Sequence, residues 1–138
     1  MKKNEPLSKV MTTDPITVHD GQPVSSLRKI FEENPIHHLP VVSGDEVIGI
    51  ITSTDFMRVS FGEFGNQDVK GLDAILDHTY KLHDIMVKNP ITIDKSSTVR
   101  EAARTLGSGD FHALPVVDDN KLIGIVTSTD LLNFLADA

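Results

Sequence analysis

Two short apolar runs, each followed at once by small hydroxyl residues and a carboxylate, dominate the hydrophobic pattern of this chain. The first covers residues 48–55 (IGIITSTD) and the second covers residues 123–130 (IGIVTSTD). A short run rich in β-branched residues predicts a buried strand, and Thr, Ser and Asp at its end predict the start of a helix. Each run therefore predicts a strand that passes directly into a helix. Polar groups gather at the carboxyl end of that strand, where ligands bind in open α/β proteins.

The residues before the first run predict the other elements of the same half. Residues 7–11 form a short helical entry that closes before Pro15, because a residue that precedes proline avoids the helical region. Residues 16–18 form a short strand, and the helix after it ends at Asn34-Pro35. The apolar face of this helix comprises the residues at helical spacing, Val24, Leu27, Ile30 and Phe31.

A β-hairpin follows this helix and contains the first run. Its strands cover 39–42 and 47–51, and the turn between them contains Gly44. We expect Ser53 or Thr54 to cap the helix after the hairpin, because a hydroxyl oxygen can accept a hydrogen bond from a free N–H group at the helix start. The apolar face of this second helix comprises Phe56, Val59 and Phe61.

The second half of the chain repeats the first. Residues 10–57 align with residues 85–132 at a constant offset of 75 and without a gap. Identity is concentrated at strand-like and turn-like positions, so the two halves are expected to share a core and a site. Thr98 and Glu101 have the spacing of a capping box. The other elements of this half are a helix stop at 107–109, strands at 114–117 and 122–126, and a helix at 129–135.

Three segments follow from this repeat: a first repeat at 7–61, a connecting segment at 62–80 and a second repeat at 81–138. We expect the connecting segment to contain a loop and an extra helix rather than a flexible linker. Its apolar residues recur at helical spacing, at Val69, Leu72, Ile75 and Leu76. Such a helix needs cover, which either the module or another subunit would provide.

Composition narrows the class of protein. With 138 residues and 39% hydrophobic content, the chain is long enough to build a core. It has no run of eighteen apolar residues and no hydrophobic signal segment, so we expect a soluble, cytoplasmic protein with no membrane association. The absence of Cys excludes disulfides and thiolate metal sites. A net charge of −7, with 13 thinly spread basic residues, makes nucleic acid an improbable partner.

The order strand, helix, hairpin, G-h-h-T-x-x-D, helix, written twice, resembles a tandem pair of CBS domains, the arrangement called a Bateman module. The resemblance covers nearly all of the chain. It implies an α/β (α+β) fold of two β-α-β-β-α repeats packed with pseudo-two-fold symmetry, with adenosyl ligands held in clefts between the repeats. Most family members attach the pair to an enzyme, channel or transporter. Here we expect a stand-alone, bacterial-type CBS domain protein that forms a homodimer through helices and regulates an unknown partner protein.

The resemblance also implies roles for the polar residues that follow the two runs. Asp55 and Asp130 match the position at which a carboxylate accepts hydrogen bonds from the ribose hydroxyls. The alternative is that these two residues only cap the helices. The matching hydroxyl residues are expected to reach ribose or phosphate, or to lie beside helix amides that meet an anionic oxygen, and they are Thr52, Thr54, Thr127 and Thr129.

Two further parts of each expected site come from the resemblance. His37 and His112 match a position that often faces nucleotide phosphates, although either residue could instead end the turn from helix to strand. The strand edges at 16–18 and 91–93 match the part that holds adenine, and their alternative is plain strand core. The residues expected at these edges are Ile16, Thr17, Val18, Ile91, Thr92 and Ile93.

Ligand identity and signalling are expectations of the same kind. Many family members have a basic residue after the His, where this chain has His38 and Ala113, which favours AMP or a low-charge adenosyl ligand such as S-adenosylmethionine over ADP or ATP. The ligand would shift the arrangement of the repeats for a partner to detect. The alternatives are a ligand-independent structural dimerisation module and, more weakly, an enzyme on nucleotides. Because the halves differ at several positions, we expect unequal sites.

Motifs for catalysis and metal binding are absent from the sequence. There is no nucleophile elbow, Walker A loop or H-E-x-x-H pattern, so we expect no enzyme, no catalytic residues and no obligatory cofactor. His78 and His83 lie near Asp77 and Asp84, but two His five residues apart do not share a helix face. We interpret them as a solvated polar surface.

Overall fold

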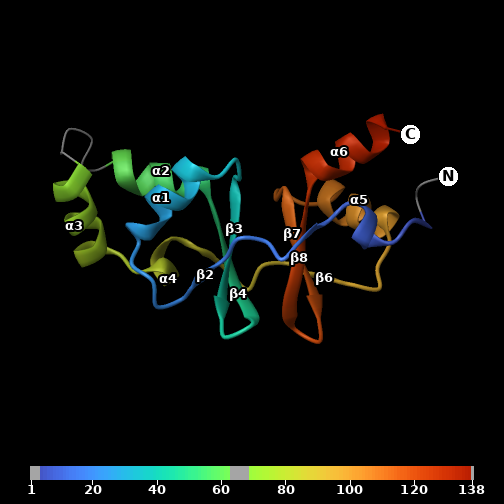
Figure 1. The fold of residues 1–138 in the computed structure, drawn as a ribbon, viewed down its shortest axis with the longest axis horizontal. Coiled ribbons are helices and arrows are strands. Elements are labelled where there is room, and N and C mark those ends of the chain that lie inside the picture. The colour runs from blue at the N-terminus through green and yellow to red at the C-terminus, as the bar shows by residue number, and fades with distance from the viewer. Residues whose placement is uncertain (1–3, 63–68, 138) are drawn as a thin grey trace. The chain divides into compact units, whose positions relative to one another are not determined.

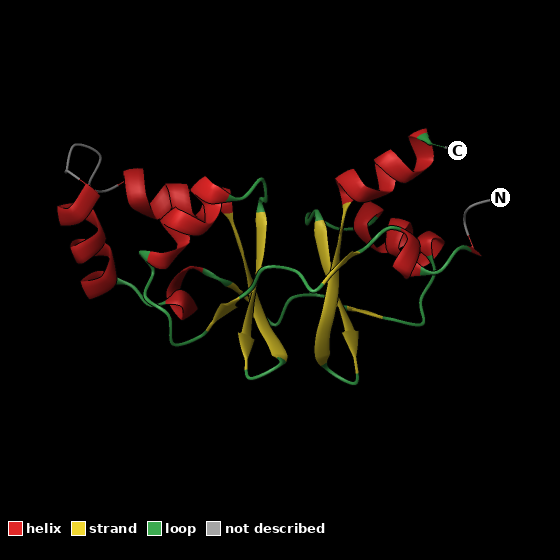
Figure 2. Cartoon of the chain, viewed as in Figure 1, coloured by secondary structure: helices red, strands yellow, loops and turns green. Residues whose placement is uncertain are grey.

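The computed structural model describes residues 4–62 and 69–137, and for residues 61, 62 and 69 it describes the backbone alone. The fold is mixed α/β, with pairs of strands separated by helices along the chain (Figure 1, Figure 2). The chain divides into two compact units. Unit 1 combines Met1–Ile16, Asp45–Val47 and Pro90–Ala138, and unit 2 combines Thr17–Gly44 and Ile48–Asn89. Each unit has its own hydrophobic core.

Unit 2 is built on strands in the order β2-β3-β4-β5. Strand β2 runs parallel to β3, and β5 runs antiparallel to β4. Helices α1 and α2 pack on each other, and α2 also packs against α3 and α4. The elements are β2 (Val18–His19), α1 (Ser26–Glu33), β3 (His38–Ser43), β4 (Glu46–Thr52, in this unit from Ile48 on), α2 (Ser53–Gly62), α3 (Val69–Thr79), α4 (Leu82–Ile85) and β5 (Val87–Lys88).

Unit 1 repeats this plan with strands in the order β6-β7-β8-β1. Strand β6 runs parallel to β7, β8 runs antiparallel to β7, and β1 runs antiparallel to β8. Helix α5 packs on α6 and on β7. The elements are the 3₁₀ helix η2 (Leu7–Lys9), β1 (Thr12–Thr13), β6 (Ile93–Asp94), α5 (Val99–Gly107), β7 (Ala113–Asp118), β8 (Lys121–Thr127) and α6 (Ser128–Ala136).

The segment in front of each repeat belongs to the sheet of the other repeat. Strand β1 precedes the first repeat's helix but pairs with β8, with Thr12 opposite Ile125. Strand β5 precedes the second repeat's helix but pairs with β4, with Ile50 opposite Val87. The sequence repeats and the compact units are therefore different divisions of the chain.

The two cores use equivalent positions of the repeat. Leu39 and Leu114 are fully buried, and so are Val41 and Val116. Val42 and Val117, the residues after these valines, are 9% and 8% exposed, and two buried apolar residues in a row indicate that both faces of the sheet are covered at these points. The hairpins and the helices after them were predicted at the right places, and each hairpin strand is one residue longer at each end than predicted. The family fold expected from the sequence is confirmed for each unit.

The short strands of the two repeats begin later than predicted. Strand β2 begins at Val18 rather than Ile16, and β6 begins at Ile93 rather than Ile91. The reason is the ladder: pairing with β3 starts at Val18 opposite Val41, and pairing with β7 starts at Ile93 opposite Val116. The residues in front of these strands are extended chain outside the ladder.

The predicted extra helix exists as α3, and it packs on unit 2. Leu72 is 5% exposed and Leu76 is fully buried, and both belong to the core of this unit. Burial of each leucine side chain contributes about 2 kcal/mol, so apolar contact is the main force that holds α3. The loop expected before this helix falls on 63–68 and lies outside the described residues, as does the side chain of Phe61.

Gly49 and Gly124 allow the paired edge strands to come close. A Cβ atom at Gly124 would lie 2.9 Å from the Thr12 carbonyl oxygen and 2.9 Å from Met11 Sδ. At the equivalent Gly49, a Cβ atom would meet the Met86 side chain and would lie 3.1 Å from the Val87 carbonyl oxygen. A backbone oxygen cannot rotate away, so each glycine is required by the close approach of its neighbouring strand.

We predict that Gly124→Ala lowers the free energy of unfolding by about 1–3 kcal/mol, because the added methyl group forces β1 away from β8. Urea unfolding followed by far-UV circular dichroism measures this change. Gly107→Ala is the matched control, because a Cβ atom there meets nothing within 4 Å and alanine favours the helix. An unfolding midpoint for Gly124→Ala equal to that of the wild type would contradict the prediction.

Candidate functional site

In unit 2 the junction between β4 and α2 is held by two reciprocal hydrogen bonds. The Asp55 N–H donates to Thr52 Oγ1 at 3.0 Å, and the Thr52 N–H donates to Asp55 Oδ2 at 3.0 Å. This is a capping box in which Thr52 is the cap and Asp55 occupies the third helical position. The predicted cap at Ser53 or Thr54 is therefore wrong. Thr52 ends the strand in extended conformation, which aims its hydroxyl at the free amides.

Unit 1 has the same junction between β8 and α6. The Asp130 N–H donates to Thr127 Oγ1 at 3.1 Å, and the Thr127 N–H donates to Asp130 Oδ2 at 2.9 Å. Capping, the alternative reading for the two aspartates, is thus present in both units. It occupies one oxygen of each carboxylate and leaves Oδ1 of each outside the box. A capping role and a ligand role are compatible for the same residue.

The two carboxylates have different neighbours. Oδ1 of Asp55 lies 3.6 Å from Arg58 Nη1, and the Asp55 side chain is 19% exposed. In unit 1 the residue equivalent to Arg58 is Asn133, which has no charge. Within residues 4–62 and 69–137, no ion pair of Asp130 is found. A ligand hydroxyl would compete with a cation for Asp55 but not for Asp130.

Each predicted histidine lies next to the capped junction of its own unit. The Ser53 N–H donates to the His37 carbonyl oxygen at 3.0 Å, and the Ser128 N–H donates to the His112 carbonyl oxygen at 2.9 Å. His37 Nδ1 is also 3.4 Å from Ser53 Oγ. Both histidines are exposed, so their rings are accessible beside the helix start.

The predicted strand edges point toward the same end of each sheet. Because β2 runs parallel to β3, the residue before it, Thr17, lies toward the end of the sheet where β3 begins and β4 ends. In unit 1, Ala113 at the start of β7 is opposite Thr127 at the end of β8, and Thr92 precedes the parallel strand β6. The edge, the histidine and the capped aspartate of each unit therefore lie toward the same end of its sheet.

Exposure falls along these edges, from the exposed residue in front of each strand to the buried first residue of the ladder. Val18 is fully buried and Ile93 is 7% exposed, so both belong to the cores. Ile16 is 41% exposed and Ile91 is 55% exposed, which is unusual for isoleucine. Ile16 is the last residue of the segment assigned to unit 1. The two isoleucines provide apolar surface that a flat ring could cover, whereas Val18 and Ile93 do not.

The two threonines in the first helical turns, Thr54 and Thr129, are exposed. Thr52 and Thr127 are half-buried, and their oxygens already accept the cap hydrogen bonds, so only their hydroxyl protons remain to be donated. All fourteen residues expected at the sites fall among those that the structure describes.

A groove in unit 2 includes residues that the sequence did not single out. It has a volume of about 690 Å³ and lies between the end of α1 and the start of α2. His37 and Ser53 line it, together with Arg28, Phe31 and Phe56. The Arg28 guanidinium lies 5.3 Å from the centre of the Phe56 ring. The spacing of Phe31 and Phe56 predicted helix faces, but nothing in the pattern indicated that they would border an open groove.

Asp94 directly follows the expected base edge of unit 1 and accepts hydrogen bonds from the next turn. The Ser96 hydroxyl and the Ser96 N–H both donate to Asp94 Oδ2. These bonds hold the pKa of the Asp94 carboxyl below its ordinary value. The equivalent position in unit 2 is His19, whose Nδ1 lies 2.9 Å from Asp20 Oδ1. The base edges of the two units thus differ in charge as well as in sequence.

In the part of the chain that the structure describes, no group of His, Asp and Glu residues has the arrangement of a metal site. The same residues include no helix that is both long and apolar enough to cross a bilayer.

Comparison with known proteins identifies the family. A family model for the CBS domain matches residues 7–62 and 82–137. The chain therefore belongs to the CBS domain family and contains this domain twice in tandem. A CBS domain-containing protein of Dictyostelium discoideum is 34% identical over 134 residues, which are 94% of this chain and 90% of that protein.

Other relatives are longer than this chain. An uncharacterized protein of Methanocaldococcus jannaschii is 29% identical over 135 residues, which cover 97% of this chain but 48% of the relative. Several homoserine O-acetyltransferases of archaea match with only about a quarter of their length. The chain thus spans half or less of the length of these curated relatives.

Solved structures share the fold. The structure of the M. jannaschii protein matches with a TM-score of 0.78 at 29% identity, over 98% of this chain and 49% of that one. The CBS domain pair of another protein, solved in complex with 5′-methylthioadenosine and S-adenosyl-L-methionine, matches with a TM-score of 0.74 at 27% identity. That comparison covers 94% of this chain and 98% of the neighbour.

We predict that Ser96→Ala raises the pKa of the Asp94 carboxyl toward its ordinary value, because the hydroxyl donor is lost while the Ser96 N–H donor remains. A folded-state pKa below the unfolded value stabilises the protein above the ordinary Asp pKa, and this contribution is lost as pH falls through the folded pKa. NMR titration of the Asp94 side chain measures the change. Ser97→Ala is the control, and equal Asp94 titration curves for wild type and Ser96→Ala would contradict the prediction.

Proposed function

We propose that this protein is a regulatory module that binds an adenosyl ligand and transmits its occupancy to a partner protein by a change of conformation. The observation that carries the proposal is that, in each unit, a capped aspartate, an exposed histidine and a threonine of the predicted base edge lie toward one end of the sheet. A carboxylate suits the two hydroxyls of ribose, an imidazole suits phosphate or another polar group, and an aliphatic side chain suits the face of adenine.

Oδ1 of each aspartate is the proposed ribose acceptor. The capping box holds the carboxylate in a fixed orientation through Oδ2, so Oδ1 accepts a hydrogen bond from a ribose hydroxyl without further ordering of the side chain. We assign Asp55 and Asp130 this role, with the hydroxyls of Thr52 and Thr127 donating hydrogen bonds to the ligand. The exposed Thr54 and Thr129 provide a second row of hydroxyl groups beside the helix amides.

The base and the remaining polar end of the ligand have separate proposed partners. Ile16 and Ile91 would cover the adenine face, with the adjacent Thr17, Val18, Thr92 and Ile93 presenting backbone groups to its edge. His37 and His112 would face the 5′ substituent. Support for an adenosyl ligand comes from the related CBS domain pair that was solved with 5′-methylthioadenosine and S-adenosyl-L-methionine. We favour AMP or a sulfur-linked adenosyl compound over ATP, because the expected basic residues after the histidines are absent.

The two sites are proposed to be unequal, with the site of Asp130 the stronger. Asp55 has Arg58 at 3.6 Å, whereas in unit 1 the position equivalent to Arg58 is the uncharged Asn133. A ligand shifts a conformational equilibrium only through different affinity for its two states. A difference between the sites therefore lets one site act at lower ligand concentration than the other.

A ligand-independent interaction module is the second candidate, and exposed apolar residues favour it. Met57 in α2 is 55% exposed, and the equivalent Leu132 in α6 is 65% exposed. Equivalent apolar positions left open in both units suit self-association through helices. The homodimer and the ligand site are compatible, and separate experiments test them.

We predict that 5′-methylthioadenosine, S-adenosylmethionine or AMP raises the melting temperature of the intact chain, and that the increase grows with ligand concentration as mass action requires. GMP should leave the melting temperature unchanged. Asp130→Asn is expected to weaken binding at least tenfold in calorimetry, because a charge-assisted hydrogen bond to ribose is lost. Asparagine keeps an acceptor for the Thr127 N–H, so the cap survives. Asp55→Asn is expected to have a smaller effect.

Thr98→Ala is the control for this experiment, because it removes the Thr98 Oγ1 acceptor of the Glu101 N–H in another helix and costs about 1 kcal/mol of stability. It should lower the melting temperature and leave ligand affinity unchanged. If neither Asp→Asn variant changes the affinity, the carboxylates are caps alone. If no adenosyl compound shifts the melting temperature, the proposal of a ligand-independent interaction module replaces the proposal of a ligand-binding regulatory module.

We predict that the chain is a homodimer and that Met57→Ser together with Leu132→Ser converts it to a monomer. The two side chains are exposed, so the double variant should unfold at the wild-type temperature once differences in concentration are removed. Sedimentation equilibrium gives the mass of both proteins. Leu135→Ser is the control, because Leu135 is as exposed as Leu132, and this variant should remain a dimer. Leu122→Ser is unsuitable because Leu122 is half-buried. A monomeric wild type would refute the prediction.

A further inference from the structure

The two units differ in what covers their second helix. In unit 2, α3 packs against α2, and Ser60 of α2 is fully buried. The residue at the equivalent position of α6 in unit 1 is Leu135, which is 67% exposed. The more apolar of the two residues is therefore the uncovered one. In a folded protein the more apolar of two equivalent residues is usually the buried one. An exposed leucine where the equivalent serine is buried therefore marks a surface that a partner can cover.

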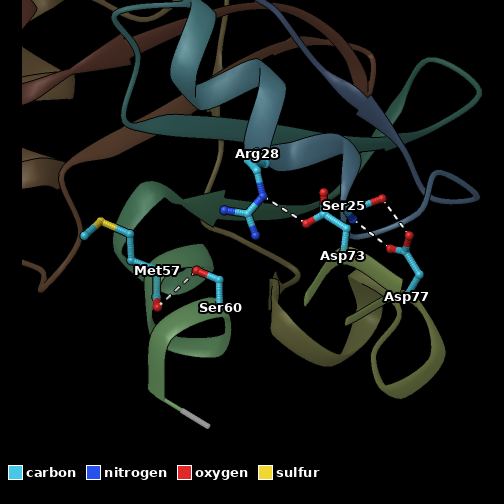
Figure 3. A network of polar contacts seen from close by, with 6 residues as sticks. All are labelled: Ser25, Arg28, Met57, Ser60, Asp73 and Asp77. Carbon is cyan, nitrogen blue, oxygen red and sulfur yellow. Dashed lines mark hydrogen bonds and ion pairs between the residues drawn. The ribbon is translucent and has the colours of Figure 1, made fainter. Parts of the chain in front are cut away.

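Figure 3 shows how the covering helix is held on unit 2. Asp73 Oδ1 of α3 accepts a hydrogen bond from Arg28 Nε at 2.9 Å. Asp77 accepts one bond from the Ser25 N–H at 2.8 Å and another from the Ser25 hydroxyl at 2.6 Å. Each aspartate directly follows a buried leucine, Leu72 or Leu76. The helix thus binds through a Leu-Asp pair that is repeated four residues later.

The equivalent surface of unit 1 carries the complementary charge. An offset of 75 places Arg100 at the position of Ser25, Ala103 at the position of Arg28 and Arg104 at the position of Lys29. All three are exposed. Arg100 and Arg104 are four residues apart on α5, so they lie on one side of that helix. Over the described ranges 4–62 and 69–137, neither arginine forms an ion pair.

We propose that the α5–α6 face, defined by Arg100, Ala103, Arg104 and Leu135, binds an amphipathic acidic helix of another protein. The partner helix presents apolar side chains at i and i+4 with a carboxylate after each, as α3 does on unit 2. Its apolar residues cover Leu135 beside the small Ala103, and its carboxylates pair with the two arginines. Arginine suits this role because its planar fork binds carboxylate oxygens in pairs.

A second copy of this chain fits the same face less well. If two α5–α6 faces met across a two-fold axis, both sides would present the same two arginines, because an isologous interface uses the same patch on both subunits. Like charges brought together oppose association. A partner with carboxylates on its helix removes this repulsion, whereas self-association adds to it.

The test uses a fluorescent, acetylated and amidated peptide with the sequence of residues 69–80, VKGLDAILDHTY, as a stand-in for the partner helix. We expect saturable binding to the intact chain by fluorescence anisotropy. Leu135→Ser, which reproduces the residue of unit 2, should weaken binding at least tenfold, and so should Arg100→Glu combined with Arg104→Glu. No adenosyl ligand is added, so failure here leaves the proposed ligand site untouched.

Val87→Ser is the matched control. Val87 of β5 is 55% exposed and lies in neither of the proposed binding surfaces, so its change should alter affinity less than twofold. A peptide with Asp73→Lys and Asp77→Lys should not bind. Because the substituted residues are exposed, unchanged melting temperatures will show that the variants fold.

Three results would overturn the proposal. The peptide could fail to bind the wild-type chain. It could bind the Leu135→Ser variant as tightly as the wild type, which would mean that it displaces α3 from unit 2. Leu135→Ser could halve the mass of the chain in solution while the peptide does not bind, which would assign the face to self-association. Loss of peptide binding in both the leucine and the arginine variants supports the proposal.

Discussion

The reciprocal cap between Thr and Asp at the end of the hairpin is the interaction on which each unit depends. It joins the last residue of a core strand to the first turn of a helix, through two hydrogen bonds of 2.9–3.1 Å in each unit. The serine between the two residues donates its N–H to the carbonyl oxygen of the histidine before the other hairpin strand. One short segment thereby fixes the strand, the helix and the histidine together.

This cap also explains how one aspartate can serve both fold and function. A cap uses a single carboxylate oxygen, and a carboxylate has two. The cap restricts the side chain to one orientation, so the second oxygen is preorganised for a ligand hydroxyl. The threonine also serves both roles, because its hydroxyl oxygen accepts a hydrogen bond from the helix N–H while the hydroxyl group can still donate one to a ligand. Replacement by asparagine, rather than alanine, is the change that separates the two roles.

The repeat gives two similar units that have diverged on their surfaces. Unit 2 acquired α3, with Leu72 and Leu76 in its core and two carboxylates on Ser25 and Arg28. The matching surface of unit 1 has Arg100, Arg104 and an exposed leucine. Divergence at the cores would have cost stability, since the buried positions Leu39 and Leu114 are equivalent and equally enclosed. The differences between the two units are concentrated at the surface, where contact with solvent or a partner helix, rather than core packing, limits which residues are tolerated.

The sequence by itself determined the repeat, the hairpins, the helices and the family, because periodicity and capping chemistry act within a few residues. It also placed Asp55 and His37 near one another, since both flank the same hairpin. Only the tertiary structure decided which strands pair across the repeats, that β2 begins at Val18, and that Thr52 is the cap. Those outcomes depend on the ladder register and on close approaches such as that at Gly124, which join residues far apart in the chain.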